Sequence, residues 1–129
     1  MATVIRVKSL ADASLTAAER RVLDRFVHLL QEEFAGELCS VWLFGSRARG
    51  EKPGPESDVD VLVVIRRASL DEHFRIGRIM DAAAEEEGAN PVFFSTSVYD
   101  PDRVAQRREI RSFFMQEVDR DKIVLAGEP

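Results

Sequence analysis

The chain has 129 residues, of which 45% are hydrophobic and 32% charged, and its formal net charge is −5. This length and composition predict one soluble globular domain, residues 1–129, and exclude a disordered chain. General nucleic-acid binders are more often basic, so no bulk binding to DNA or RNA is expected. No hydrophobic run approaches the ~20 residues that span a bilayer, and the N-terminus lacks a signal-peptide core. We therefore expect a cytoplasmic protein without a membrane segment.

The N-terminal half predicts one helix and two strands. Thr16 and Glu19 have the spacing of a capping box, hydrophobic residues then recur every three or four positions, and Gly36 suits the helix end. Residues 38–44 and 59–65 are short and hydrophobic, which is typical of buried strands. The residues between them at 50–57 are rich in Gly and Pro and predict a loop.

The C-terminal half predicts two helices and two short strands. A second helix is expected from Ser69 to Gly88, and its inward face would carry Leu70, Phe74, Met80 and Ala83 or Ala84. Residues 91–94 suggest a strand whose Pro91 marks its start or a sheet edge. A third helix over 102–118 would direct Ile110, Phe113, Phe114 and Val118 inward. A last strand is expected over 122–125, and residues 3–7 could add another. The fold class is thus α/β (α+β), a small mixed sheet flanked by helices.

Two carboxylates, Asp58 and Asp60, stand at the start of the second strand. Residues two apart in a strand project to the same face, so these acids point the same way. Carboxylates this close repel each other unless a proton or a cation lies between them. Oxygen ligands with few supporting groups suit Mg²⁺, which keeps several waters and takes substrate phosphates as further ligands.

A glycine follows the first strand, where Gly45 and Ser46 precede Arg47, Ala48 and Arg49. A junction of strand, glycine and helix offers backbone N–H groups to an anion, with Ser46 as a plausible helix cap. Arg47 and Arg49 could neutralise phosphate charge or lie at the surface. Gly45 and Gly50 have the spacing of a P-loop, but Glu51 and Lys52 follow where Lys and Ser or Thr are required, so that motif is excluded.

Together these segments resemble the minimal nucleotidyltransferase (MNT) family of the DNA polymerase β-like superfamily. The resemblance covers the whole chain in length and element order, and its specific motif spans residues 43–64. It implies a polymerase-β-like fold in which Gly45 and Ser46 bind the triphosphate of an NTP, with Arg47 and Arg49 nearby. It also implies that Asp58 and Asp60 are catalytic and hold Mg²⁺, in a two-metal site.

Two features depart from the family pattern. Eleven residues separate Ser46 from Asp58, one more than is usual, and a surface loop readily absorbs one residue. Active members also carry a third acid on the next core strand, and none occurs between Gly88 and Val98. Asn90 could be a weak ligand, and we interpret Glu85, Glu86 and Glu87 as a solvated run.

Other chemically suggestive residues have simpler interpretations. Cys39 lies in a hydrophobic stretch and is interpreted as a small buried residue, and His28 and His73 have no partner at metal-ligand spacing. Arg103, Arg107 and Arg111 share one predicted helix face. They could bind RNA, a nucleotide or an acidic partner, or could form a solvated face, which we favour.

The leading hypothesis is an Mg²⁺-dependent enzyme that transfers a nucleoside monophosphate, expected to be AMP from ATP, to a hydroxyl acceptor. The family resemblance further implies an antitoxin that modifies a helical HEPN-type partner. The alternative is a weak or inactive binding module that neutralises its partner by complex formation, because the third acid is missing. The sequence leaves the base preference, the acceptor and the oligomeric state open.

Overall fold

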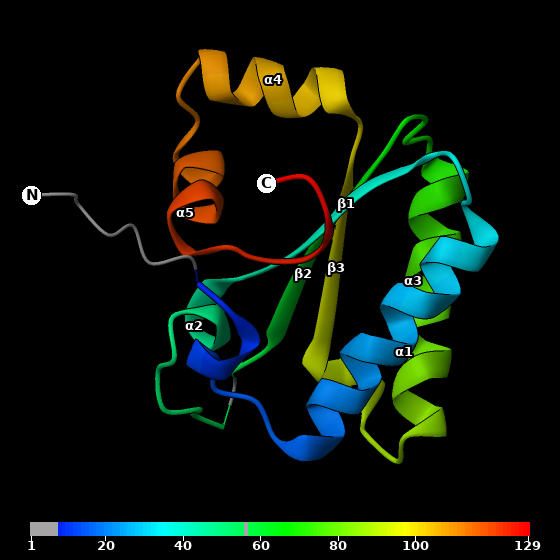
Figure 1. Ribbon diagram of the computed structural model, residues 1–129, viewed down its shortest axis with the longest axis vertical. Helices are drawn as coiled ribbons and strands as arrows, with labels where there is room; N and C mark the ends of the chain where they lie inside the picture. The colour runs from blue at the N-terminus through cyan, green and yellow to red at the C-terminus, as the bar shows by residue number, and fades with distance from the viewer. Residues whose placement is uncertain (1–7, 56) are drawn as a thin grey trace, which may run out of the picture.

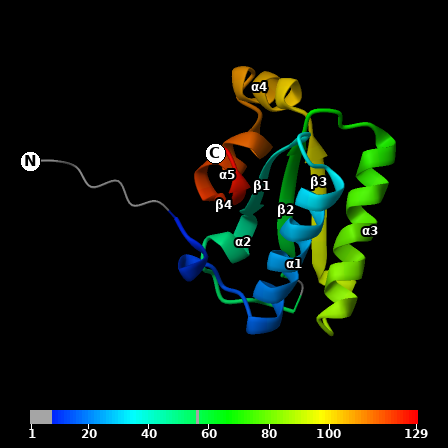
Figure 2. The same ribbon diagram turned by 45° about the vertical axis from the view of Figure 1, so that its right-hand side comes forward.

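The computed structural model describes residues 8–55 and 57–129, and a mixed four-stranded sheet lies at its centre with helices on both faces (Figure 1, Figure 2). The strand order is β3-β2-β1-β4; β1 is antiparallel to β2 and β4, and β2 is parallel to β3. The predicted fold class is therefore confirmed. The strand suggested at residues 3–7 lies outside the described residues.

The strands are β1 (Leu38–Phe44), β2 (Val59–Ile65), β3 (Phe94–Tyr99) and β4 (Ile123–Gly127). The helices are η1 (Leu10–Asp12), α1 (Ala17–Glu33), α2 (Gly45–Ala48), α3 (Leu70–Glu86), η2 (Pro91–Phe93), α4 (Pro101–Glu109) and α5 (Phe113–Asp121).

Helix α1 begins as its sequence predicts. The Thr16 hydroxyl accepts a hydrogen bond from the Glu19 backbone N–H at 3.1 Å, and the Glu19 carboxylate accepts one from the Thr16 N–H at 2.8 Å. Two backbone donors that the first turn leaves without helical partners are thereby satisfied. The capping box is confirmed, and it fixes Glu19 at a position that matters for the site below.

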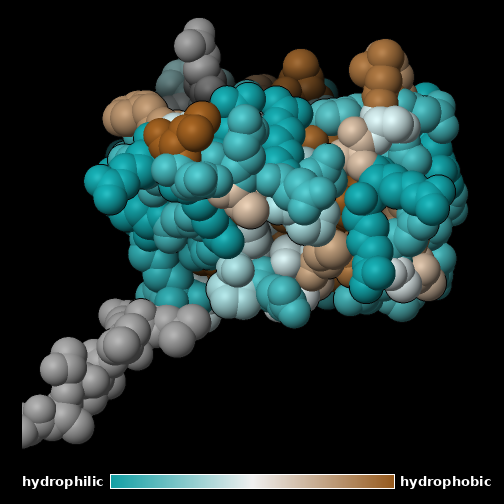
Figure 3. Space-filling model, turned by 90° about the horizontal axis from the view of Figure 1, so that it is seen from above, coloured by the Kyte–Doolittle hydropathy of each residue, from teal (hydrophilic) through white to brown (hydrophobic). Residues whose placement is uncertain are grey.

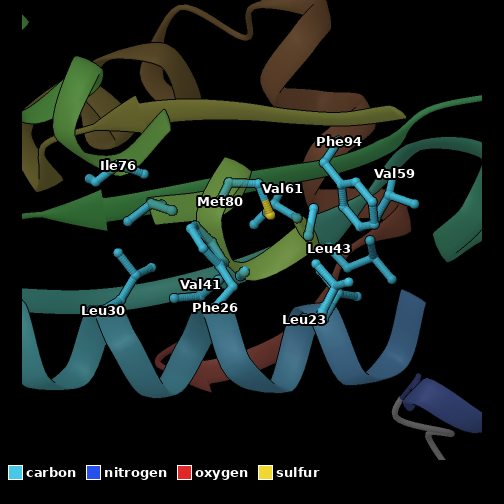
Figure 4. Packing of buried hydrophobic residues seen from close by; sticks show 14 of the residues in the cluster. Leu23, Phe26, Leu30, Val41, Leu43, Val59, Val61, Ile76, Met80 and Phe94 are labelled. Carbon is cyan, nitrogen blue, oxygen red and sulfur yellow. The ribbon is translucent and has the colours of Figure 1, made fainter. Parts of the chain in front are cut away.

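Strand β2 is buried on both faces, so it contributes to two hydrophobic clusters. Val61 and Val63 face α1 and α3 in the larger cluster, where Phe26 and Met80 meet the sheet (Figure 4). The intervening residues face the smaller cluster, which comprises Trp42, Leu62, Val64, Val104, Met115 and Val118. Side chains alternate along a strand, so a continuous hydrophobic run lets β2 pack helices on both sides.

The inward face of α3 differs from the prediction. Leu70 is 71% exposed and Phe74 is 59% exposed, while Ile76 is fully buried. Met80, Ala83 and Ala84 are buried as expected. At about 100° per residue, Leu70 and Phe74 lie roughly a third of a turn from the buried stripe. The prediction that Leu70 and Phe74 face inward is therefore wrong, because it used their hydrophobicity and not their position around the helix.

The segment predicted as a strand over residues 91–94 is mostly a 3₁₀ turn. Pro91 opens η2, whose first turn is capped by the Asn90 side chain accepting from the Val92 N–H at 3.1 Å. Strand β3 begins only at Phe94, so Pro91 does not start it, and among the described residues β3 lies at an edge of the sheet. Proline and the Asn90 cap favour a turn over an extended start.

The helix predicted over 102–118 is two helices. Arg111 has a φ of +54°, which ends the first helix, and the Ser112 side chain caps the second by accepting from the Met115 N–H. Of the residues expected inward, Val118 is buried, but Ile110 is 58% and Phe113 77% exposed. The break lets α5 turn down beside α2 while α4 crosses the top of the molecule (Figure 1).

Over the described ranges, no helix is both long and hydrophobic enough to cross a membrane.

Candidate functional site

The register of β1 and β2 brings the two predicted halves of the site together. Phe44, the last residue of β1, pairs with Asp60 near the start of β2. The antiparallel arrangement places the turn after β1 beside the acids that open β2. Gly45 and Ser46 therefore lie next to Asp58 and Asp60 at one end of the sheet.

Gly45 is in contact with Asp60. A Cβ atom at Gly45 would lie 2.6 Å from the Asp60 Oδ2 atom, and the residue has a φ of +79°. Any other side chain would meet both a collision and a strained backbone. Close approach between the turn and the carboxylate thus requires glycine.

Ser46 lies inside the short helix α2 and does not cap it. The capping residue is Phe44, so the predicted capping role of Ser46 is wrong. The Ser46 Oγ atom lies 3.2 Å from the Oγ atom of Ser57, the residue that precedes the acid pair. Ser46 still lines the cavity described below.

Asp60 carries the most perturbed carboxyl group of the site. Burial raises its pKa to about 6, and the neighbouring Asp58 carboxylate adds to the effect, while Arg47 and Arg49 oppose it. Asp58 itself is exposed. A bound cation would stabilise the charged form of this carboxyl group, because it offsets both the desolvation of Asp60 and its repulsion by Asp58. Two oxygen ligands that open toward solvent fit Mg²⁺, which completes its shell with water and phosphate.

Arg47 is buried among groups of its own chain. Its guanidinium donates to the Ser57 Oγ atom at 3.0 Å and to the Ser57 carbonyl at 3.2 Å. It also donates to the Ser14 carbonyl at 2.9 Å and to the Glu19 carboxylate at 2.8 Å. Arg47 therefore connects α2 to the residue before Asp58 and to the cap of α1.

Arg49 lies at the wall of the site with acidic partners. It donates to the Asp121 carboxylate at 2.7 Å, and it forms an ion pair with Glu51 at 3.0 Å. Hydrogen bonds to these two acids raise the pKa of the Arg49 guanidinium. The contact with Asp121 links the phosphate-side turn to α5.

A cavity of about 340 Å³ opens between the turn after β1 and α5. On one side are residues that the sequence predicts, including Gly45, Ser46, Arg49 and Asp60; on the other are Phe114, Glu117 and Asp121 of α5. The α5 residues were missed, because a continuous helix would have directed Phe114 into the core. The only sequence signal was Ser112, a cap residue inside the predicted helix.

The position expected for a third acid holds a serine. Ser95 of β3 pairs with Asp60 in the parallel register, so its side chain projects beside Asp60. In the described part of the chain, no cluster of three or more His, Cys, Asp or Glu residues is placed to hold a metal ion. The acids available to a cation at the start of β2 are thus Asp58 and Asp60.

The other polar residues considered from the sequence lie away from the cavity. His28 pairs with Glu32 on the exposed side of α1, and Cys39 is partly buried against the smaller cluster. Arg103 lies over the Tyr99 ring at 4.4 Å. The face seen from above, over α4, is mainly hydrophilic with separate hydrophobic spots (Figure 3), which is typical of a solvated surface.

The family model described as "Nucleotidyltransferase domain" matches residues 23–126, which include both halves of this site. No curated protein matches the chain.

Several solved structures share the fold. A mutant of the toxin–antitoxin complex MntA-HpeT is 15% identical, with a TM-score of 0.53 and coverage of 82% of this chain and 73% of that chain. A minimal nucleotidyltransferase is 22% identical, with a TM-score of 0.52 over 85% of this chain and 97% of that chain. The MNT antitoxin complex of a tri-AMPylated Shewanella oneidensis HEPN toxin is 14% identical, with a TM-score of 0.50 over 84% and 72%. The chain thus has the fold of minimal nucleotidyltransferases.

Proposed function

Because the chain belongs to the nucleotidyltransferase domain family, we propose that it transfers AMP from ATP to a hydroxyl group of a partner protein. The observation that carries this proposal is the contact between Gly45 and Asp60 across β1 and β2. That contact brings a glycine turn suited to phosphate within reach of a carboxylate pair suited to Mg²⁺.

Each residue of the site has a role in this reaction. The backbone at Gly45 and the Ser46 hydroxyl bind the triphosphate, and Asp58 and Asp60 hold Mg²⁺. When bound, the ion neutralises phosphate charge and lowers the pKa of the acceptor hydroxyl. Arg49 lines the cavity, where its charge is shared with Asp121 and Glu51. The acceptor oxygen forms a bond to the α-phosphorus, the bond to the β-phosphate oxygen breaks, pyrophosphate leaves, and the hydroxyl proton passes to solvent.

We assign Arg47 a positioning role in place of a direct phosphate contact. Its guanidinium is buried and bonded to Ser14, Glu19 and Ser57. A phosphate would have to displace several of these hydrogen bonds at considerable cost. Arg47 instead holds the residue before Asp58 against α2.

The partner we propose is a helical HEPN-type protein. It is supported by a similar structure in which an MNT antitoxin is bound to a HEPN toxin that carries AMP groups. We expect the hydroxyl to come from a docked protein.

The test is transfer of label from ATP labelled in its AMP part, in the presence of Mg²⁺ and a purified HEPN-type protein offered as the partner. We expect label on the partner, and its loss in Asp58→Asn and Asp60→Asn. Mn²⁺ binding to the protein without ATP should also fall in both variants. Asp24→Asn, on the exposed side of α1, is the matched control.

A second function is favoured by Ser95 at the position beside Asp60. In this alternative the protein neutralises its partner by binding alone. A tight complex without label transfer, unaffected by Asp58→Asn and Asp60→Asn, would establish it and exclude the enzyme.

A further inference from the structure

Helix α5 forms a wall of the cavity opposite the phosphate-side turn. Phe114, Glu117 and Asp121 recur at three- or four-residue spacing, so they share one helix face, and all three line the cavity with Gly45 and Ser46. Of these three side chains, Asp121 is bonded to Arg49 and Arg120 and is almost fully buried. Phe114 and Glu117 are therefore the α5 side chains through which a ligand would be recognised.

Phe114 is an aromatic residue held in place but left partly open. Its ring packs at right angles to Phe44, with centroids 5.5 Å apart, and lies 6.1 Å from the Tyr99 ring. Despite these contacts it remains 37% exposed at the rim of a polar cavity. A ring fixed by two neighbours loses little conformational entropy when a flat ligand packs on it.

Glu117 offers a carboxylate in the same cavity. Its ion pair with Arg120 is long, at 3.8 Å, and its side chain is 43% exposed. A carboxylate accepts hydrogen bonds only, so it suits hydroxyl donors and disfavours phosphate. The polarity of the cavity thus changes from phosphate-compatible at Gly45 and Ser46 to hydroxyl-compatible at Glu117.

We propose that Phe114 and Glu117 form the nucleoside end of the cavity. The base packs on the Phe114 ring, and the Glu117 carboxylate accepts hydrogen bonds from the ribose hydroxyls. This inference rests on the proposed function, because it requires the triphosphate to lie at Gly45 and Ser46. An aromatic ring stacks with any base, so the Phe114 contact adds affinity for the nucleoside and does not itself select adenine.

Calorimetry with two ligands separates the subsite from the phosphate site. Mg²⁺-ATP contains both parts, whereas Mg²⁺-tripolyphosphate contains only the phosphate part. We expect Phe114→Ala to weaken ATP binding about tenfold or more and tripolyphosphate binding less than about twofold. Phe113→Ala is the matched control, since Phe113 is adjacent, 77% exposed and absent from the cavity lining. Phe114→Leu keeps hydrophobic contact with Phe44 and guards against loss of folding, which thermal unfolding monitors.

The ribose contact has its own comparison. Loss of the ribose hydroxyls in 2′,3′-dideoxy-ATP should weaken binding to the original protein about fivefold, but not to Glu117→Ala, which has no side-chain acceptor. Glu109→Ala, on exposed α4, should behave like the original protein.

Three results would overturn the subsite. The first is unchanged ATP affinity in both Phe114→Ala and Phe114→Leu. The second is an equal loss of affinity for ATP and for tripolyphosphate. The third is a loss of label transfer with unchanged ATP affinity, which would assign the α5 wall to the acceptor. If the original protein binds neither ATP nor tripolyphosphate, the proposed function is wrong, and this result differs from all three that overturn the subsite alone.

Discussion

Gly45 is the residue on which the geometry of the site depends. We expect Gly45→Ala to destabilise the protein by about 2–3 kcal/mol, since the new Cβ meets the Asp60 carboxylate at 2.6 Å and the backbone has a φ of +79°. ATP binding should be lost in the same variant. Chemical denaturation and calorimetry provide the measurements.

Substitutions at two other glycines separate the two causes of the destabilisation by Gly45→Ala, the collision with Asp60 and the backbone strain. Gly36 has a φ of +80°, and no atom lies within 4 Å of the position that a Cβ would occupy, so Gly36→Ala should show the backbone cost alone, about 1 kcal/mol. Gly54 has neither feature, so Gly54→Ala should be close to neutral. If Gly45→Ala costs no more than Gly36→Ala, the contact with Asp60 has no energetic weight.

Asp60 should make stability and metal binding depend on pH. Its pKa is raised from the usual 3.8 to about 6, so the folded state binds the proton more tightly than the unfolded state. Asp60 therefore supports folding below its unfolded pKa and loses that contribution as pH rises to about 6. We expect Asp60→Asn to stabilise the protein by about 1 kcal/mol at neutral pH and by almost nothing near pH 4. The value at neutral pH is smaller than the pKa shift alone implies, because solvent screens the partly exposed carboxylate.

The same titration governs the proposed cation site. As pH falls through about 6, protons should compete with Mn²⁺ for Asp60, and the affinity should decrease. Denaturation at several pH values, with Mn²⁺ titration alongside, tests both effects. A variant whose stabilisation does not change between acidic and neutral pH would contradict the assignment of Asp60 as a buried, repelled carboxylate.

At the scale of elements, Arg47 joins α1, α2 and the loop before β2. Arg47→Met should destabilise the protein by about 3 kcal/mol, because it leaves the Glu19 carboxylate without its buried cationic partner. Adding Glu19→Gln should recover part of the loss, since a neutral amide needs no cation. A double-mutant cycle from denaturation curves measures the coupling. Simple additivity of the two substitutions would show that the pair is not coupled.

The break between α4 and α5 is the element-scale feature that hydrophobic periodicity could not locate. Ile110, Phe113 and Phe114 have helical spacing, so a single helix satisfied the pattern. The chain instead adopts a φ of +54° at Arg111, and the Ser112 side chain caps α5. Burial of Met115 and Val118 against Trp42 favours this geometry over a straight helix.

At the scale of the whole molecule, stability depends on helices packed on both faces of the sheet. Met80→Ala should cost about 2–5 kcal/mol, because the side chain is buried in the larger cluster between α3 and the sheet (Figure 4). Leu70→Ala, on the same helix but 71% exposed, should cost less than about 0.5 kcal/mol. Denaturation curves of the two variants provide the test, and equal costs would contradict the orientation of α3.

The amino-acid sequence by itself determined the elements that local chemistry specifies. The capping box at Thr16, the hydrophobic run of β2 and the Gly45–Ser46 turn each depend on neighbouring residues, and all three lie where the sequence predicts them. The proximity of Gly45 to Asp58 and Asp60 also followed from the motif. The cap, the hydrophobic run and the turn need no knowledge of distant contacts, whereas that proximity depends on the register of β1 and β2.

Only the tertiary structure decided which distant residues complete the cavity. Register places Ser95 beside Asp60, and the turn at Arg111 brings Phe114 and Glu117 opposite Gly45. Packing against Ser14, Glu19 and Ser57 also buries Arg47. Each of these outcomes depends on packing between segments far apart in the chain, which local propensity and periodicity do not encode.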